Sequence, residues 1–243
     1  MTPVQVVIVL AFVAFAAFMQ KVSGFGFGLI AVPLMSLVVA PQRAVIISTL
    51  LGLFTTIMQA WVERRHTVVP VARRLFLGAC VGMPLGLIVY VKVPPNGLRL
   101  VLGVIVIAAA FTLSRGFTLA HGDERAEFVV GAMSGVLNTS ISTNGPPLVF
   151  LLQARGYEPH TFRGTISRVF LYSNIVSVSL FVAAGKVHRT PAYVALAAVP
   201  IVLCMQWIGA KVQPHVRGER FRSLVLVLMY ASGISAIIAG LTH

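Results

Sequence analysis

Two apolar stretches of this chain are interrupted by residues that bend the backbone, and each interruption stands at the corresponding point of one half of the sequence. The first is Ser23-Gly24-Phe25-Gly26-Phe27-Gly28, and the second runs from Asn138 to Pro147. Backbone that leaves the helix at membrane depth is tolerated only where it is buried in protein or lines a wet cavity. Paired interruptions in two halves of a chain are the best sequence pointer to the substrate site of a transporter.

The residue types at these two breaks predict an anion site that is built largely from backbone. Glycine lets the chain bend and approach a ligand closely, and proline suits the first turn of a restarting helix. Two helix N-termini that face one cavity direct free N–H groups at an anion. The alternative is that the glycines only let helices pack closely, but two matched breaks favour a substrate site. The residues predicted to bind substrate here are Gly24, Gly26, Gly28, Asn138, Thr139, Thr143, Asn144, Gly145 and Pro146.

The second break is also rich in polar side chains, with six between Asn138 and Asn144. In hydrocarbon these groups need hydrogen-bond partners. They could bind a polar substrate, satisfy the unwound backbone, or do both.

Three basic residues lie in or beside apolar stretches and are predicted to contact an anion. Arg168 lies six residues into the stretch that begins at Phe162, Arg163 lies at its start, and Lys21 borders the first break. A charge inside the membrane is a functional-site hypothesis by default, and the arginine fork matches oxyanions. The alternative is that these long side chains only reach back to the membrane surface.

No other chemistry is indicated. The six acidic residues lie at the ends of apolar stretches or in loops, so a proton relay of buried carboxylates is not expected. The two cysteines and six histidines have no metal-ligand spacing. We find no nucleophile with an adjacent base at membrane depth. We therefore predict no metal, no cofactor and no enzymatic activity.

Composition indicates an all-α polytopic membrane protein. Hydrophobic residues make up 58% of the 243 residues and charged residues only 10%, against about 25% charged residues in soluble domains. The formal charge of +13 comes mostly from residues between apolar runs, where they set topology rather than bind nucleic acid. The predicted partners are a small anion and the lipid bilayer, with no nucleic acid, and the sequence leaves a homodimer open.

The chain reads as two repeats, residues 1–116 and 125–243, joined by a loop at 117–124. Gly86 and Arg99 are thirteen residues apart, as are Gly209 and Arg222. Stretches 29–40, 126–137 and 145–154 are too short for a full span, which takes ~20 residues, so each repeat is expected to hold a glycine-broken or re-entrant helix pair near the midplane.

The distribution of basic residues in the loops favours broken helix pairs that return to the membrane face from which they enter. If each pair crosses the membrane, the basic loop residues divide evenly between the two membrane faces. If each pair returns, eleven fall on one face and five on the other. The positive-inside rule then makes the richer face cytoplasmic and both termini external. Each half makes an odd number of crossings, so the repeats are predicted to be inverted.

The motifs resemble those of the TauE/SafE family of sulfite and organosulfonate exporters. Ser23-Gly24-Phe25-Gly26-Phe27-Gly28-Leu29-Ile30-Ala31-Val32-Pro33-Leu34 is similar to its first-repeat motif, and Gly131-Ala132-Met133-Ser134-Gly135 with Asn144-Gly145-Pro146-Pro147-Leu148-Val149 to its second. Phe162-Arg163-Gly164-Thr165 resembles the stretch that follows. This resemblance, which covers essentially the whole chain, implies a bacterial inner-membrane permease with two repeats. Thr143-Asn144-Gly145 departs from the common glycine triplet, which puts the substrate, but not the class, in doubt.

The predicted function is export of a small sulfur-containing oxyanion, sulfite or an organosulfonate such as sulfoacetate, by alternating access at a midplane site. An anion channel would use the same residues without alternating access. A non-transporting membrane subunit of a complex is the other alternative, although polar breaks at midplane depth would then have no explanation.

Overall fold

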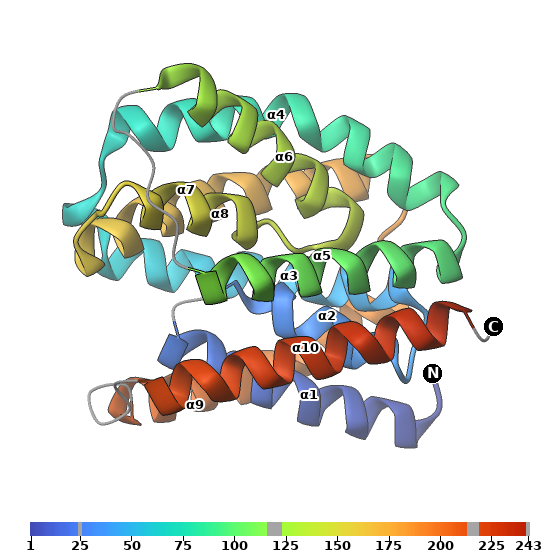
Figure 1. The fold of residues 1–243 in the computed structure, drawn as a ribbon. Coiled ribbons are helices and arrows are strands. Elements are labelled where there is room, and N and C mark those ends of the chain that lie inside the picture. Colours follow the sequence, from blue (N-terminus) through green and yellow to red (C-terminus); the bar gives the residue numbers. More distant parts are fainter. Residues whose placement is uncertain (24–25, 116–122, 213–218, 242–243) are drawn as a thin grey trace.

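The computed structural model describes the chain except for residues 24–25, 116–122, 213–218 and 242–243 (Figure 1). The described part contains α-helices and one short 3₁₀-helix, and no strand. The elements are α1 (Pro3–Ser23), α2 (Phe27–Ser36), α3 (Pro41–Val62), η1 (Arg64–His66), α4 (Val69–Lys92), α5 (Pro95–Arg115), α6 (Glu124–Ile141), α7 (Gly145–Ala154), α8 (Pro159–Ala183), α9 (Arg189–Val212) and α10 (Glu219–Leu241).

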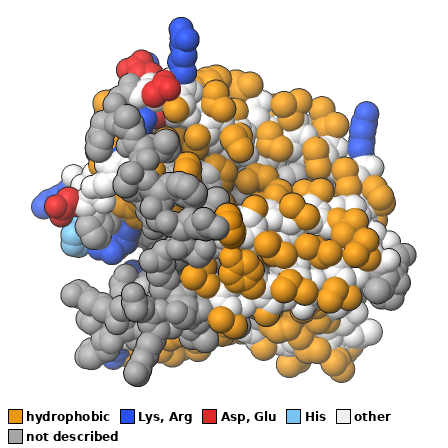
Figure 2. Space-filling view, viewed as in Figure 1, with side chains coloured by type: hydrophobic (Ala, Val, Ile, Leu, Met, Phe, Trp, Pro, Cys, Tyr) orange, Lys and Arg blue, Asp and Glu red, His pale blue; other side chains and the backbone are white. Residues whose placement is uncertain are grey.

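Five of the described helices are long and apolar enough to cross a membrane: α1, α3, α4, α8 and α9, with spans of 20 to 24 residues. Their outward faces carry large hydrophobic side chains such as Trp61, Leu85 and Leu196, which are 57–70% exposed. Figure 2 shows hydrophobic side chains over much of the visible surface, with most of the charged ones at one end. The protein is therefore an all-α polytopic membrane protein, as composition predicts.

Each broken helix pair turns back toward the end of the bundle from which it starts. The side-chain amide of Gln5, near the start of α1, donates to the carbonyl of Val38, just past α2, at 3.1 Å. Arg155, just past α7, donates to the carbonyl of Asp123, just before α6, at 3.1 Å. The start of α1 and the end of α10 lie at the same end of the bundle (Figure 1). Of the two arrangements compared from the sequence, helix pairs that return to their starting end are the one that places most of the basic loop residues at the other end of the bundle.

The helix contacts made by the first half of the chain correspond to those made by the second half. Helix α4 packs against α6 and α8, and α9 packs in the same way against α1 and α3. Helix α3 packs against α8, and α5 against α10. Exchanging α1 with α6, α3 with α8, α4 with α9 and α5 with α10 leaves this set of neighbours unchanged. Two inverted repeats would produce this pattern, but the duplication of the chain and the boundary at 117–124, most of which lies outside the described residues, stay predictions.

The closest helix pair, α4 with α6, is held by facing rows of small residues. A β-carbon added at Gly78 or Gly82 on α4 would overlap a carbonyl oxygen of α6, those of Phe128 and Ala132. A β-carbon at Gly131 or Gly135 on α6 would likewise overlap a carbonyl oxygen of α4. Glycines four residues apart lie on one helix face, and small residues let membrane helices approach closely. The Gly131–Gly135 motif therefore packs helices here.

We expect Gly82→Ala to separate α4 from α6, because the backbone oxygen of Ala132 cannot rotate away from the new methyl group. Overpacking of this kind costs about 1–3 kcal/mol. Titration of the purified protein with SDS in mixed micelles measures the loss of stability. Leu85→Ala is the control, since Leu85 lies on α4 and is 57% exposed on its outer face. Equal stability of Gly82→Ala and the wild type would contradict the assigned interface.

The second break is shorter than the sequence indicates. We expected it to begin at Asn138, but α6 continues to Ile141 and the helix ends at Ser142. The hydroxyl of Ser140 donates to the carbonyl of Val136 at 2.6 Å, and that of Thr139 lies 3.2 Å from the carbonyl oxygen of Gly135. These bonds within the helix let polar residues continue it in an apolar environment.

Candidate functional site

The two breaks meet each other in the interior. A β-carbon at Gly28 would overlap the carbonyl oxygen of Ser142, so the two backbones touch there. A β-carbon at Gly145 would lie 3.7 Å from the backbone nitrogen of Gly26 and 3.7 Å from the ring of Phe170 on α8. Tertiary structure therefore places Gly28 against Ser142 and Gly26 against Gly145. Gly24 lies outside the described residues.

Ser142 holds the second break in an unusual conformation. Its φ of 54° and ψ of 32° are left-handed, and it is the one non-glycine residue with positive φ in the described chain. Such backbone persists only where its surroundings over-determine it. On α3, the hydroxyl of Thr49 donates to the Ser142 hydroxyl at 3.1 Å, which donates to that of Ser48 at 3.1 Å. Ser48 and Thr49 were missed by sequence reasoning, because small hydroxyl residues are common in membrane helices.

Two helices begin at this junction. Helix α2 starts after Gly26, and no side chain caps its first turn. Helix α7 starts at Gly145, followed by Pro146 and Pro147. The N-terminus of a helix carries a partial positive charge and free N–H donors, although Pro146 and Pro147 have no N–H, so in the first turn of α7 only Gly145 and Leu148 can donate. The junction therefore has the electrostatic character of an anion site.

Two buried side chains near this junction have polar atoms without a hydrogen-bond partner among the described residues. These atoms are the amide nitrogen of Asn144, directly before α7, and the hydroxyl of Ser173 on α8. Asn144 is 7% exposed and Ser173 1%. A buried donor without a partner costs about 1–3 kcal/mol, which a ligand with oxygen acceptors would recover.

The inward face of α8 carries a buried polar row next to the junction. Phe170, Ser173, Asn174 and Ser177 follow the spacing of one helix face and are at most 6% exposed. Asn138 donates to the Ser177 hydroxyl at 2.8 Å, and Asn174 to the Thr56 hydroxyl at 3.4 Å. Sequence reasoning missed this row. The helical spacing of Ser173, Asn174 and Ser177 within an apolar stretch could have indicated a buried polar face.

Several of the predicted polar residues bond to protein groups. Thr139 donates to the carbonyl of Met83 on α4 at 2.6 Å, and Thr143 to that of Ile141 at 3.1 Å. Asn138 binds Ser177, as above. Of these three, Thr143 bonds to backbone beside the break, whereas Asn138 and Thr139 bond to neighbouring helices. The amide nitrogen of Asn144 has no partner among the described residues, and substrate binding by these residues stays a prediction.

Lys21 lines a cavity of about 210 Å³ between α1, α3 and α9, together with Gln20, Gln59 and Gln206. The amide of Gln206 donates to Gln20 at 3.2 Å, and the amide of Gln20 donates to the hydroxyl of Thr55 at 3.4 Å. Thr55 is fully buried, and its neighbour Thr56 bonds to Asn174. Polar groups therefore run from the cavity of Lys21 to the buried row on α8.

Arg168 is not brought to the breaks. Phe170, which contacts them, is two residues further along α8, about 200° around the helix. Arg168 instead lines a groove of about 350 Å³ between α4 and α8, together with Arg73. The sequence did not reveal this placement, because a position in the sequence does not say which way a helix faces, and contact of Arg168 with an anion stays a prediction.

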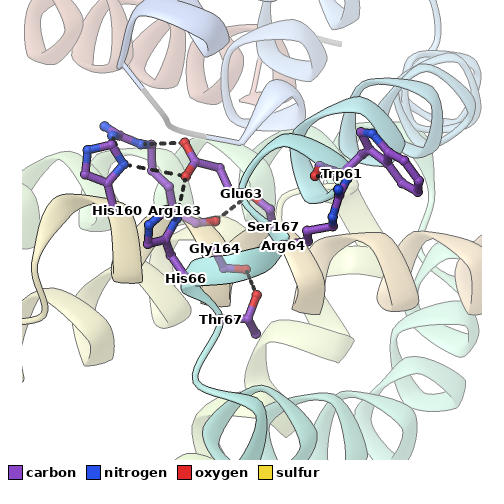
Figure 3. A network of polar contacts seen from close by, with 9 residues as sticks. All are labelled: Trp61, Glu63, Arg64, His66, Thr67, His160, Arg163, Gly164 and Ser167. Carbon is purple, nitrogen blue, oxygen red and sulfur yellow. Dashed lines mark hydrogen bonds and ion pairs between the residues drawn. The ribbon is translucent and has the colours of Figure 1, made fainter.

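Arg163 lies at the start of α8 in a polar junction with the α3–α4 connection (Figure 3). Its guanidinium donates to Glu63 at 3.2 Å, and Thr67 donates to the carbonyl of Gly164 at 3.1 Å. A β-carbon at Gly164 would lie 2.8 Å from the carbonyl oxygens of Glu63 and His66. The Phe162–Thr165 motif therefore joins α8 to the end of α3, and Arg163 is not brought to the breaks.

Metal ligands are available in this junction. Ligand atoms of Glu63, His66 and His160 lie within 4.8 Å of one another, and divalent metals bind such groups. Arg163 already engages two of these residues: besides its bond to Glu63, its guanidinium lies 3.3 Å from the Nδ1 of His160. The arrangement is thus an ion-pair network between α3, η1 and α8.

Comparison with known proteins supports a transport role. A family model described as Sulfite exporter TauE/SafE matches residues 9–236. A curated relative from Comamonas testosteroni, the probable inner membrane transporter protein TsaS, is 29% identical over 126 residues, which are 49% of this chain and 53% of the relative. The chain thus matches about half the length of that relative, and no solved structure matches it. Since the family match spans nearly the whole sequence, this chain belongs to the TauE/SafE sulfite exporter family of membrane transporters.

Proposed function

We propose that this protein exports a small sulfur-containing oxyanion, sulfite or an organosulfonate such as sulfoacetate, across a bacterial inner membrane. The family match supports transport of such an anion, and the name of the Comamonas relative supports the inner membrane.

The observation that carries the proposal is the unpartnered amide nitrogen of Asn144 beside two helix N-termini. Asn144 is 7% exposed and directly precedes α7, while Gly26, which directly precedes α2, lies against Gly145. An oxyanion here would accept from the amide and from backbone N–H groups. Hydrogen bonds to a charged group contribute about 1.5–3 kcal/mol each.

The cavity of Lys21 supports access from the basic end of the bundle. It lies near the ends of α1, α3 and α9, at the same end as Arg64, Arg65 and Arg155. The positive-inside rule makes this end cytoplasmic. The anion enters past Lys21, and the polar side chains from Gln20 to Asn174 replace part of its hydration on the way to the breaks.

Alternating access follows from rocking of the two packed halves about the junction of the breaks. The exchange of neighbours between the halves gives two similar arrangements, one open to each end, as in transporters built from inverted repeats. A membrane potential of 100 mV, negative inside, favours export by ~2.3 kcal/mol for each negative charge. A dianion gains about twice that, so no coupling ion is needed.

Replacement of Asn144 by aspartate tests the site. Asn144→Asp removes the amide donors and adds a negative charge, so we expect efflux of labelled sulfite from proteoliposomes to fall at least tenfold, given the strength of a charge-assisted hydrogen bond. Efflux is measured with an inside-negative potential, and sulfoacetate, sulfate and acetate are run in parallel. Asn96→Asp is the control, because Asn96 lies in the first turn of α5, outside the site.

Three outcomes decide between the candidate functions. Saturable efflux of a sulfur oxyanion that Asn144→Asp abolishes supports the exporter. Efflux that does not saturate and far exceeds carrier rates supports an anion channel with the same site. Folded wild-type protein that moves none of these anions overturns the proposal and favours a non-transporting subunit.

A further inference from the structure

We propose that the groove between α4 and α8 binds the phosphate of an anionic phospholipid through Arg73 and Arg168. This site is separate from the two breaks and independent of the substrate. The groove has a volume of about 350 Å³, and apart from the two arginines its described lining is apolar.

Neither arginine has a partner among the described residues. Arg168 is half-buried and Arg73 exposed, and among the described residues neither makes a hydrogen bond or ion pair. The adjacent Arg74 differs, since it pairs with Glu124 and Glu127 on α6. Arg73 and Arg74 therefore point to different sides of α4, and only Arg74 meets acidic groups. No acidic side chain is among the described lining of the groove.

The position of Arg168 favours an anion beside it. It lies in the span His160–Ala183, one helical turn beyond Gly164, against which the polar α3–α4 connection packs. Arg168 is therefore just below the polar end of the bundle. A charge there is costly unless it is paired or reaches the surface.

The two guanidinium groups are directed toward the same membrane surface. The start of α4 lies beside the second turn of α8, because the amide of Val68 donates to the hydroxyl of Thr165 at 3.1 Å, so both helices start at the same end of the bundle. Helical side chains lean toward the N-terminus of their helix. Arg73 and Arg168 therefore both extend toward the end of the bundle where lipid phosphates lie, and arginine binds phosphate through its fork of donors.

The rest of the groove suits an acyl chain. Phe76 and Tyr172 pack across it with ring centroids 5.5 Å apart, and Tyr172 and Ile175 are 43% and 45% exposed. A phospholipid supplies both the phosphate and the hydrocarbon that this lining requires, whereas a free anion supplies only the charge. Clusters of basic residues between membrane helices recognise anionic head groups in this way.

Native mass spectrometry of the full-length protein tests the site. The protein is released from detergent with added phosphatidylglycerol, phosphatidylcholine or inorganic phosphate. We expect wild-type protein to retain phosphatidylglycerol in preference to the other two. Arg73→Gln/Arg168→Gln should bind it about tenfold more weakly, the loss of one charge-assisted hydrogen bond or more. Arg64→Gln/Arg65→Gln, which removes two exposed charges at the same end, should bind as the wild type does.

Three results would overturn the proposal: equal retention of phosphatidylcholine, equal binding of inorganic phosphate, or an equal loss in the Arg64/Arg65 control. Size-exclusion chromatography checks that the double variant is folded. If it is not, Arg73→Lys/Arg168→Lys replaces it, since lysine keeps the charge but loses the fork. The Lys variant is measured at 0.5 M salt, where plain charge attraction is screened, and the two single Gln variants are measured beside it. If all of these variants retain phosphatidylglycerol as the wild type does, the lipid does not bind at these two arginines.

Discussion

Gly28→Ala is expected to lower transport more than tenfold, whereas Gly26→Ala, two residues earlier, is expected to leave the packing of the two breaks intact. A β-carbon at Gly28 would overlap the carbonyl oxygen of Ser142, and the hydroxyl of Ser48 would lie 3.1 Å away. A β-carbon at Gly26 would meet only the ring of Phe170, at 3.9 Å, an ordinary contact. The two variants thus differ in whether the breaks can touch.

The expected magnitude is large because the obstacle is backbone. Ser142 is held in a left-handed conformation by hydroxyl groups of α3, so it cannot retreat without losing those bonds. We expect Gly28→Ala to lower the free energy of unfolding by about 2–3 kcal/mol and sulfite efflux by more than tenfold. Efflux and SDS titration are measured on both variants. Full efflux in Gly28→Ala would show that the breaks need not touch for transport.

The second large effect is expected from Glu127, a buried carboxylate at the start of α6. Its two oxygens accept from Arg74 on α4 and from Arg155 beyond α7. Glu127 is 1% exposed and Arg155 3%. Glu127→Gln leaves these arginines with a neutral partner, and removing one member of a buried ion pair costs about 3–5 kcal/mol.

Glu124→Gln is the matched control. Glu124 pairs with the same Arg74 at 3.0 Å, but its side chain is 70% exposed, and exposed pairs contribute about 0–1 kcal/mol. SDS titration of both variants compares the two. Equal stability of Glu127→Gln and Glu124→Gln would show that the buried cluster does not hold α4, α6 and α7 together. Adding Arg155→Met to Glu127→Gln should restore part of the loss, because it removes the deepest uncompensated charge.

Glu127 also shows a limit of the sequence argument. We identified the acidic residues as lying at the ends of apolar stretches, and Glu127 does lie in the first turn of α6. The sequence did not reveal that this end is buried against two arginines. Its pairing with two arginines gives it a structural part, and the absence of a proton relay stays a prediction.

Hydropathy alone determined that this protein is a helical membrane protein, because apolar length and composition decide whether a segment enters a bilayer. The two breaks could also be read from sequence, since glycine and proline act on their own backbone. The family resemblance was likewise visible in the residues from Ser23 to Leu34 and from Gly131 to Val149, and the family match confirmed it.

Only the tertiary structure decided which way each side chain faces. In a soluble helix an apolar stripe identifies the buried face, but a membrane helix is apolar on both faces, so the pattern carries little information. Arg168 and Phe170 on α8 therefore looked alike in position, although one lines the outer groove and the other covers the breaks. For the same reason the sequence did not distinguish Thr139, which bonds to Met83 on α4, from Asn144, whose amide nitrogen stays without a partner. Long-range packing determines which of these side chains face the junction, because it alone brings α2, α3, α7 and α8 together there.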